Sequence, residues 1–210
     1  MHQELVNAIT HGCGLVLALV GSAWLLSVAA EHGDRRCVVG CAVFAASMVA
    51  VYAASTLSHG VQTMHLRKRL RIMDQAFIYL MIAGTYTPFG LTYLQGGHWW
   101  VLTTAMWVVA WSGFIAKVWF GYRVEAATVW TYVLLGWLPI TAVKPLLTTV
   151  PMGAMGWMLA GGLCYTIGSV FLTLDSRVKY FHAVWHLLVI AGSVCHFLAI
   201  YWYVARGITA

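Results

Sequence analysis

Long apolar stretches alternate with short polar segments along the whole chain. Each stretch is about 20 residues long, the length that an α-helix needs to cross the hydrocarbon core of a bilayer. The pattern predicts seven such spans after a short amphipathic helix at about 2–11. The spans are expected at about 12–30, 37–58, 74–94, 99–119, 125–143, 152–174 and 181–204. The sequence therefore predicts an all-α integral membrane protein with seven transmembrane helices.

The composition strengthens this prediction and simplifies the domain organisation. Hydrophobic residues make up 61% of the chain and charged residues only 9%, which excludes an ordinary soluble domain. The apolar runs continue to the end without a long polar insertion, so residues 1–210 are expected to form a single membrane domain. The first run has neither a basic lead-in nor a small-residue cleavage site, which indicates a retained span. The five cysteines form no CxxC pair, and no disulfide framework is expected.

The lysine and arginine residues predict the orientation of the helices, because cytoplasmic loops are enriched in them. With a cytoplasmic N-terminus, eight of the 12 basic residues lie on the inner side: Arg67, Lys68, Arg69, Arg71, Lys117, Arg123, Arg177 and Lys179. The outer side holds the other four: Arg35, Arg36, Lys144 and Arg206. This bias favours an N-terminus inside and a C-terminus outside the cell membrane. The net charge of +6 is explained by basic residues that orient the helices in the membrane, so no nucleic-acid partner is expected.

The segment Phe181–His186 carries the most informative polar residues. His182 and His186 are four residues apart at the start of the last span, so both imidazoles leave the same helical face. Ionisable side chains are costly inside a membrane helix, which makes them candidates for function. The predicted topology places His59, at the end of the second span, and Asp74, at the start of the third, at the same depth. These four side chains can therefore converge.

Such a group is typical of a catalytic zinc site, in which three histidines leave a fourth position open to water. Ser55 precedes His59 by one turn and faces the same pocket. Asp74 could ligate the metal, or hold and deprotonate its water, or simply cap the third span. The spacing alone leaves other interpretations open. Membrane histidines also serve as hydrogen-bonded helix contacts or as members of a proton relay.

Two further histidines are assigned other roles. His196 lies fourteen residues after His182, which is about 21 Å along a helix, so it is excluded from the same metal site. It is expected to be a contact in the middle of the membrane. His11 shares one helical face with Glu4 and Asn7 and lies at the inner end of the first span. It could reach the site, although a structural role is favoured.

Several motifs, in order and spacing, are similar to one known family. They are Glu4 to His11, Ser55-x-x-x-His59, Asp74 followed by 82–88 (IAGTYTP), 135–137 (LGW), 161–168 (GGLCYTIG) and Phe181 to His186. Together they cover nearly the whole chain. The sequence resembles the bacterial hemolysin III proteins, which belong with the progestin and adiponectin receptor (PAQR) family of seven-helix proteins and are grouped with the alkaline ceramidases.

The resemblance implies a Zn²⁺ ion held by His59, His182 and His186, with Asp74 bonding the metal water and Ser55 close by. It also implies a cytoplasmic N-terminus. Two positions depart from the family pattern: Gln75 stands where bacterial members commonly have histidine, and Ser58 where an aromatic residue is often found. Neither departure removes a ligand, but both are expected to change the shape of the pocket.

Three functions follow as hypotheses. The first is a zinc-dependent hydrolase that cleaves an amide or ester bond of a membrane lipid near the inner leaflet and serves lipid homeostasis. The second is a membrane-state sensor with purely structural zinc and a lipid or fatty-acid ligand between the helices. The third is a pore-forming cytolysin, which is disfavoured because no span carries polar residues down one face. The sequence leaves the lipid and the oligomeric state open, a homo-oligomer included.

Overall fold

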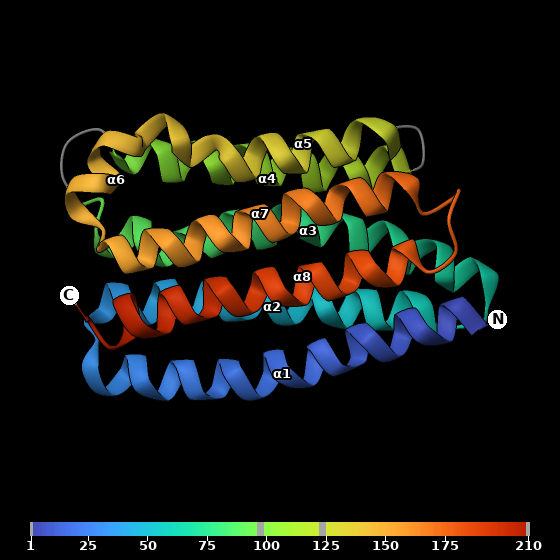
Figure 1. The fold of residues 1–210 in the computed structure, drawn as a ribbon, viewed down its shortest axis with the longest axis horizontal. Coiled ribbons are helices and arrows are strands. Elements are labelled where there is room, and N and C mark those ends of the chain that lie inside the picture. Colours follow the sequence, from blue (N-terminus) through green and yellow to red (C-terminus); the bar gives the residue numbers. More distant parts are fainter. Residues whose placement is uncertain (1, 96–98, 122–124, 209–210) are drawn as a thin grey trace.

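The computed structural model describes residues 2–95, 99–121 and 125–208, and these residues form helices and no strand. The helices lie side by side in an elongated bundle, with the two ends of the chain at opposite ends of it (Figure 1). The elements are α1 (His2–His32), α2 (Arg35–Gly60), α3 (Met64–Thr92), α4 (Trp99–Phe120), α5 (Glu125–Trp137), the 3₁₀ element η2 (Leu138–Ala142), α6 (Val143–Thr149), α7 (Met152–Leu174), α8 (Phe181–Ile200) and the π-helical η3 (Tyr201–Ala205). The all-helical prediction is confirmed.

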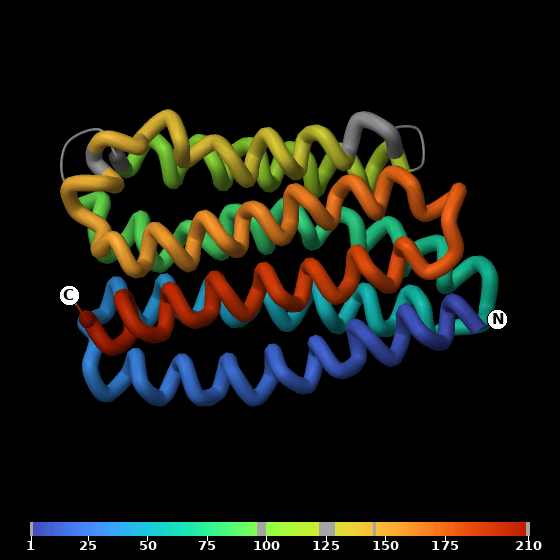
Figure 2. The backbone as a smooth tube through the Cα atoms, viewed as in Figure 1, coloured from blue at the N-terminus to red at the C-terminus, as the bar shows by residue number. Residues whose placement is uncertain are grey.

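The order of neighbours in the bundle brings the first and last helices together. Helix α2 packs against both α1 and α3, α3 packs against α4, and α7 packs against α8. Helix α8 also contacts α1, so chain segments that are far apart in sequence lie next to each other (Figure 2). As a result, residues of α1, α2, α3 and α8 surround one space at the end of the bundle where the N-terminus lies.

Five helices are long and apolar enough to cross a membrane: α1, α2, most of α4, α7, and α8 with η3. The prediction of a membrane protein is therefore supported. The helices at the expected third and fifth spans are not both long and apolar enough to meet this criterion. In α3 the threonines, tyrosine and proline of 85–88 lower the hydropathy, and the fifth segment contributes only a shorter apolar helix, Val129–Ala142.

The fifth segment differs from the single helix expected at about 125–143. Helix α5 ends at Trp137, a 3₁₀ turn follows, and α6 continues the segment to Thr149. Pro139 lies at the start of this turn, and its missing N–H interrupts the α-helical hydrogen bonds. The segment also continues through Lys144 and Pro145, where the sequence had indicated an end.

Helix α3 is longer at its start than the sequence indicated. It begins at Met64, with Thr63 as the N-terminal flanking residue, so Asp74 lies ten residues inside the helix. The interpretation of Asp74 as a helix cap is therefore wrong. In the same way, the expected amphipathic segment at about 2–11 and the first span form one continuous helix, α1.

Close contact between α2 and α3 fixes the position of one helix along the other. At Gly40, an added Cβ would lie 2.7 Å from the Cα of Pro88, so only glycine permits the approach. Pro88 remains inside α3, which continues past it to Thr92. This contact lies near the opposite end of α2 from His59. It fixes α2 against α3, and the two helices together place His59 and Asp74 at one end of the bundle.

Candidate metal centre

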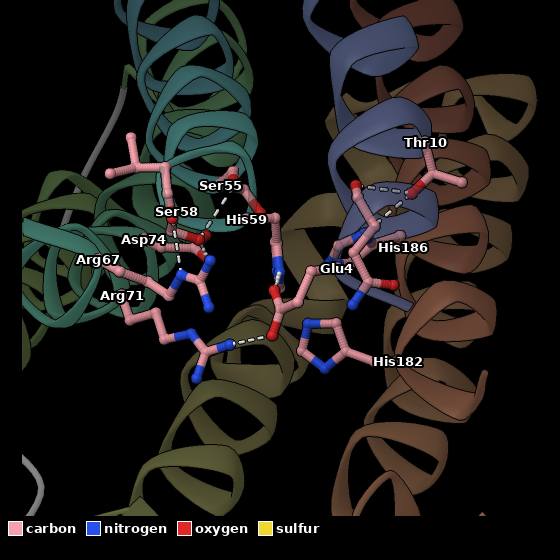
Figure 3. Close-up of polar contacts among 12 residues, drawn as sticks. Glu4, Thr10, Ser55, Ser58, His59, Arg67, Arg71, Asp74, His182 and His186 are labelled. Carbon is pink, nitrogen blue, oxygen red and sulfur yellow. Dashed lines mark hydrogen bonds and ion pairs between the residues drawn. The ribbon is translucent and has the colours of Figure 1, made fainter. Parts of the chain in front are cut away.

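Three histidines meet at the end of the bundle where the N-terminus lies (Figure 3). His59 comes from the last turn of α2, and His182 and His186 come from the first two turns of α8. One ligand nitrogen from each lies within 4.8 Å of the others. The ring centroids are 5.0 Å apart for His59 and His182, 5.1 Å for His59 and His186, and 4.6 Å for His182 and His186. The three side chains could hold a metal ion.

The same nitrogen of each ring, Nδ1, already has a partner. Nδ1 of His59 lies 2.8 Å from Oε2 of Glu4, and Nδ1 of His182 lies 2.7 Å from Oδ2 of Asp175. An ionised carboxylate only accepts hydrogen bonds, so each of these two Nδ1 atoms carries the proton. In a neutral imidazole, the lone pair then resides on Nε2, the atom that remains for a metal.

Nδ1 of His186 also carries the proton, but its acceptor is a hydroxyl group and not a carboxylate. Nδ1 of His186 lies 3.1 Å from Oγ1 of Thr10. Thr10 donates its only hydroxyl proton to the carbonyl oxygen of Asn7, at 2.9 Å, so its oxygen accepts from His186. All three histidines therefore present an unprotonated Nε2. The Nε2 of His59 is buried and has no hydrogen-bonding partner among the described residues, which suits a metal ligand.

Glu4 and Asp175 were not recognised from the sequence as partners of the histidines. Glu4 also pairs with Arg71 at 2.5 Å, so one carboxylate of α1 connects α2 with α3. The available signal was the polar face of α1 on which Glu4, Asn7 and His11 lie. Asp175 gave no such signal because it follows α7 in a turn that ends at Tyr180, whose φ of 67° is uncommon for a residue other than glycine.

Asp74 lies close to the histidines but outside the group of three. The hydroxyl of Ser58 is 3.1 Å from its Oδ2 and 3.0 Å from the carbonyl oxygen of Ser55. Ser58, one of the two departures from the family pattern, therefore holds Asp74 in place. Ser55 is fully buried one turn before His59, and both it and Asp74 line the cavity described below.

His11 contacts the cluster without joining it. Its ring stacks on His186, with centroids 3.5 Å apart and planes 19° apart, and neither of its nitrogens has a hydrogen-bonding partner within the described part of the chain. The edge of its ring also meets Tyr52. The favoured structural role of His11 agrees with this packing. His196 lies outside the cluster as well.

A cavity of about 930 Å³ extends from the histidines into the bundle. Residues of α1, α2, α3, α5, η2, α6, α7 and α8 line it, and their side chains become mostly apolar away from the histidines. Several lining residues at the far side are also exposed on the outer surface of the bundle: Ile140, Leu147, Met152 and Leu159. The cavity is therefore open to the surroundings of the bundle as well as to the histidine cluster.

Removing the carboxylate of Glu4 is expected to weaken metal binding. In Glu4→Gln, the Nδ1 atom of His59 loses a charged acceptor, and the affinity of the three histidines for a metal ion, measured with Zn²⁺ as the probe, should fall about 10- to 100-fold. Competition with a chromophoric chelator measures this affinity. The matched control is Glu31→Gln, because the Glu31 side chain is 70% exposed at the other end of α1. Equal zinc affinities for the two variants would contradict the role given to Glu4.

Comparison with known proteins agrees with the resemblance seen in the sequence. The model of the haemolysin-III related family matches residues 1–197. Hemolysin-3 of Bacillus cereus is 39% identical over 202 residues, which cover 96% of this chain and 92% of that protein. The hemolysin-3 homolog of Bacillus subtilis is 34% identical over 204 residues, covering 97% and 95%. The human monocyte to macrophage differentiation factor, a PAQR-type protein, is 26% identical over 217 residues, covering 99% and 87%. The chain therefore belongs to the hemolysin III family of membrane proteins.

Proposed function

We propose that this protein is a zinc-dependent membrane hydrolase that cleaves an amide or ester bond of a lipid. One observation carries the proposal. Three histidines at the end of a largely apolar cavity each use Nδ1 for a hydrogen bond, which leaves the lone pair of each Nε2 available for a metal. Asp74 lies beside them without belonging to the group. Three neutral imidazoles with an open fourth position form the ligand set of many catalytic zinc sites.

Zinc in such a site supplies Lewis acidity and lowers the pKa of water from 15.7 to about 7. In the proposed reaction, Asp74 accepts a proton from the attacking water and later returns it to the leaving group. Ser58 keeps the Asp74 carboxylate oriented through the contact at Oδ2. Ser55 donates a hydrogen bond to the oxyanion that develops on the scissile carbonyl.

The cavity supports a lipid as the substrate. Its volume of about 930 Å³ accommodates an acyl chain, and its apolar walls would keep that chain out of water. The exposed residues Ile140, Leu147 and Met152 mark a lateral entrance from the bilayer near η2, where the fifth segment is irregular. The scissile bond would then lie next to the histidines. Turnover of a membrane lipid by such an enzyme would serve lipid homeostasis.

We further propose the topology expected from the sequence. All of residues 1–210 form one domain that crosses the cell membrane seven times, with α3 and the segment from α5 to α6 as the additional crossings. The positions of the chain ends at opposite ends of the bundle support an odd number of crossings (Figure 1). Arg67 and Arg71 lie at the same end as the histidines (Figure 3), which supports a cytoplasmic location for the site.

Zinc content and fatty-acid release from the purified protein test this proposal. We expect about one zinc ion per chain and release of fatty acid from at least one class among ceramides, phospholipids and simple acyl esters. His186→Ala, which removes one Nε2, is the control and should lose both properties. Bound zinc without release above this control from any lipid class would contradict the enzyme and leave the metal site standing.

One observation favours a second candidate function. The histidine cluster joins α2 to α8, and through Glu4 and Thr10 it also joins α1. A metal in this position would connect three helices and could serve a membrane-state sensor with structural zinc. The two functions differ in the expected effect of replacing Asp74.

A further inference from the structure

His196 lies on the wall of the cavity, far from the histidine cluster. It is ten residues beyond His186 on α8, which corresponds to about 15 Å along the helix axis. Only 2% of its surface is exposed, and it lines the same cavity as the three histidines of the metal centre. A polar ring in the apolar half of the cavity calls for an explanation.

Two tyrosines hold this ring without forming a hydrogen bond to it. Tyr165 stacks on His196 at 5.4 Å, with an angle of 23° between the planes, and Tyr86 approaches edge-on at 6.4 Å. The hydroxyl of Tyr165 lies 3.0 Å from Oγ of Ser193, and that of Tyr86 donates to the carbonyl oxygen of Gly136. Both hydroxyls are thus already in use.

The neighbouring helix leaves space for an imidazole here. At Gly161 of α7, an added Cβ would lie 2.6 Å from both Nε2 and Cδ2 of His196. Any larger residue at 161 would displace the ring. Stacking on Tyr165 and the space at Gly161 together fix the ring against the cavity wall.

One nitrogen of His196 is not used for hydrogen bonding by the described residues. Its Nδ1 is buried without a hydrogen-bonding partner in the described parts of the chain. Such a group is unfavourable in an apolar region unless something else pairs with it. A half-turn about the Cβ–Cγ bond exchanges nitrogen and carbon positions with little change of shape, so the edge toward the cavity can present a nitrogen to an occupant.

We propose that His196 forms a second binding subsite, which recognises a hydroxyl group in the middle of the ligand's acyl chain. A neutral imidazole offers one donor and one acceptor, and a hydroxyl group can match either. With the head of the lipid at the histidine cluster, the chain passes His196 about 15 Å away. The inference rests on the lipid cavity of the proposed function, and it adds the class of chain that the cavity prefers.

Binding of free fatty acids to the full-length protein in nanodiscs tests the subsite. The probes are octadecanoic acid, the same acid with a hydroxyl near the middle of the chain, and the same acid with a hydroxyl beside the carboxyl group. We expect the mid-chain hydroxy acid to bind about fivefold more tightly than the unsubstituted acid, the effect of one net hydrogen bond. Equal affinities, or a preference for the hydroxyl beside the carboxyl group, would overturn the proposal.

Two variants connect the preference to His196. His196→Phe keeps a ring against Tyr165 but removes both nitrogens, and Gly161→Ala displaces the ring. Each should lose the fivefold preference and still bind octadecanoic acid. Val170→Ala is the control, because Val170 is exposed on the same helix and is not one of the residues that line the cavity. A preference that persists in both variants would overturn the proposal.

The same preparations separate this subsite from the proposed enzyme. Free acids need no hydrolysis in order to bind, so the chain preference is measured even if no lipid is cleaved. Zinc content should be unchanged in His196→Phe, because His196 is not one of the three clustered histidines. A missing hydrolase activity with an intact hydroxyl preference would contradict the enzyme alone.

Discussion

In the proposed hydrolase, replacing Asp74 with asparagine is expected to slow lipid hydrolysis by a factor of about 100 to 10,000 while zinc remains bound. Asparagine has nearly the same shape and can still accept a hydrogen bond from Ser58, so the local structure should persist. It cannot take a proton from the attacking water. Metal binding should persist because Asp74 is not a member of the histidine group. Fatty-acid release and zinc content, measured on the same sample, provide the check.

Asp34→Asn is the matched control for this variant. Asp34 caps α2 by accepting a hydrogen bond from the backbone N–H of Cys37 at 2.8 Å, and asparagine caps helices about equally well. It lies at the opposite end of α2 from His59 and should leave hydrolysis unchanged. Full activity in Asp74→Asn would exclude Asp74 as the general base. Unaltered function of this variant in cells would favour the sensor with structural zinc.

Among the changes considered, removal of the proposed zinc ion is expected to cause the largest loss of folding stability. A ligand present at a thousand times its dissociation constant stabilises the folded state by about 4 kcal/mol. The cluster joins helices from both ends of the chain, so this free energy should appear in global unfolding. A chelator should therefore lower the thermal unfolding midpoint of the protein in detergent, and added zinc should restore it.

His59→Ala should unfold at the lower temperature with or without added zinc. His65→Ala serves as its control, because His65 is exposed near the start of α3 and lies outside the cluster. The control should respond to chelator and zinc as the parent protein does. A midpoint that is insensitive to the chelator in the parent protein would show that the three histidines do not bind zinc.

Much of the fold could be predicted because membrane helices must satisfy their own backbone hydrogen bonds. The apolar runs therefore lie within a few residues of α2, α4, α7 and α8, whereas α1 begins about ten residues before its apolar run. Hydropathy indicates which residues can face lipid, but a helix can continue beyond those residues into polar sequence. For this reason α3 begins well before its apolar part, in a stretch rich in arginine and lysine, which are good helix formers.

The candidate site could be predicted as far as it depends on the depth of each residue in the membrane. Helical spacing and the charge bias brought His59, Asp74, His182 and His186 to one level, and the three histidines do meet. Depth does not determine which way a side chain points around its helix. The roles of Glu4 and Thr10 depend on the rotation of α1 against α8, and that of Asp175 depends on a turn. These contacts follow from tertiary packing.

The contact between the first and last helices has a consequence for biosynthesis. Glu4 and Thr10 leave the ribosome well before Asp175, His182 and His186, with which α1 and α2 share the cluster. A chain that stops before α8 lacks two of the three clustered histidines, however well its earlier helices have inserted. Capture of the metal would therefore mark the moment at which α8 has packed against α1 and α2 in the bilayer.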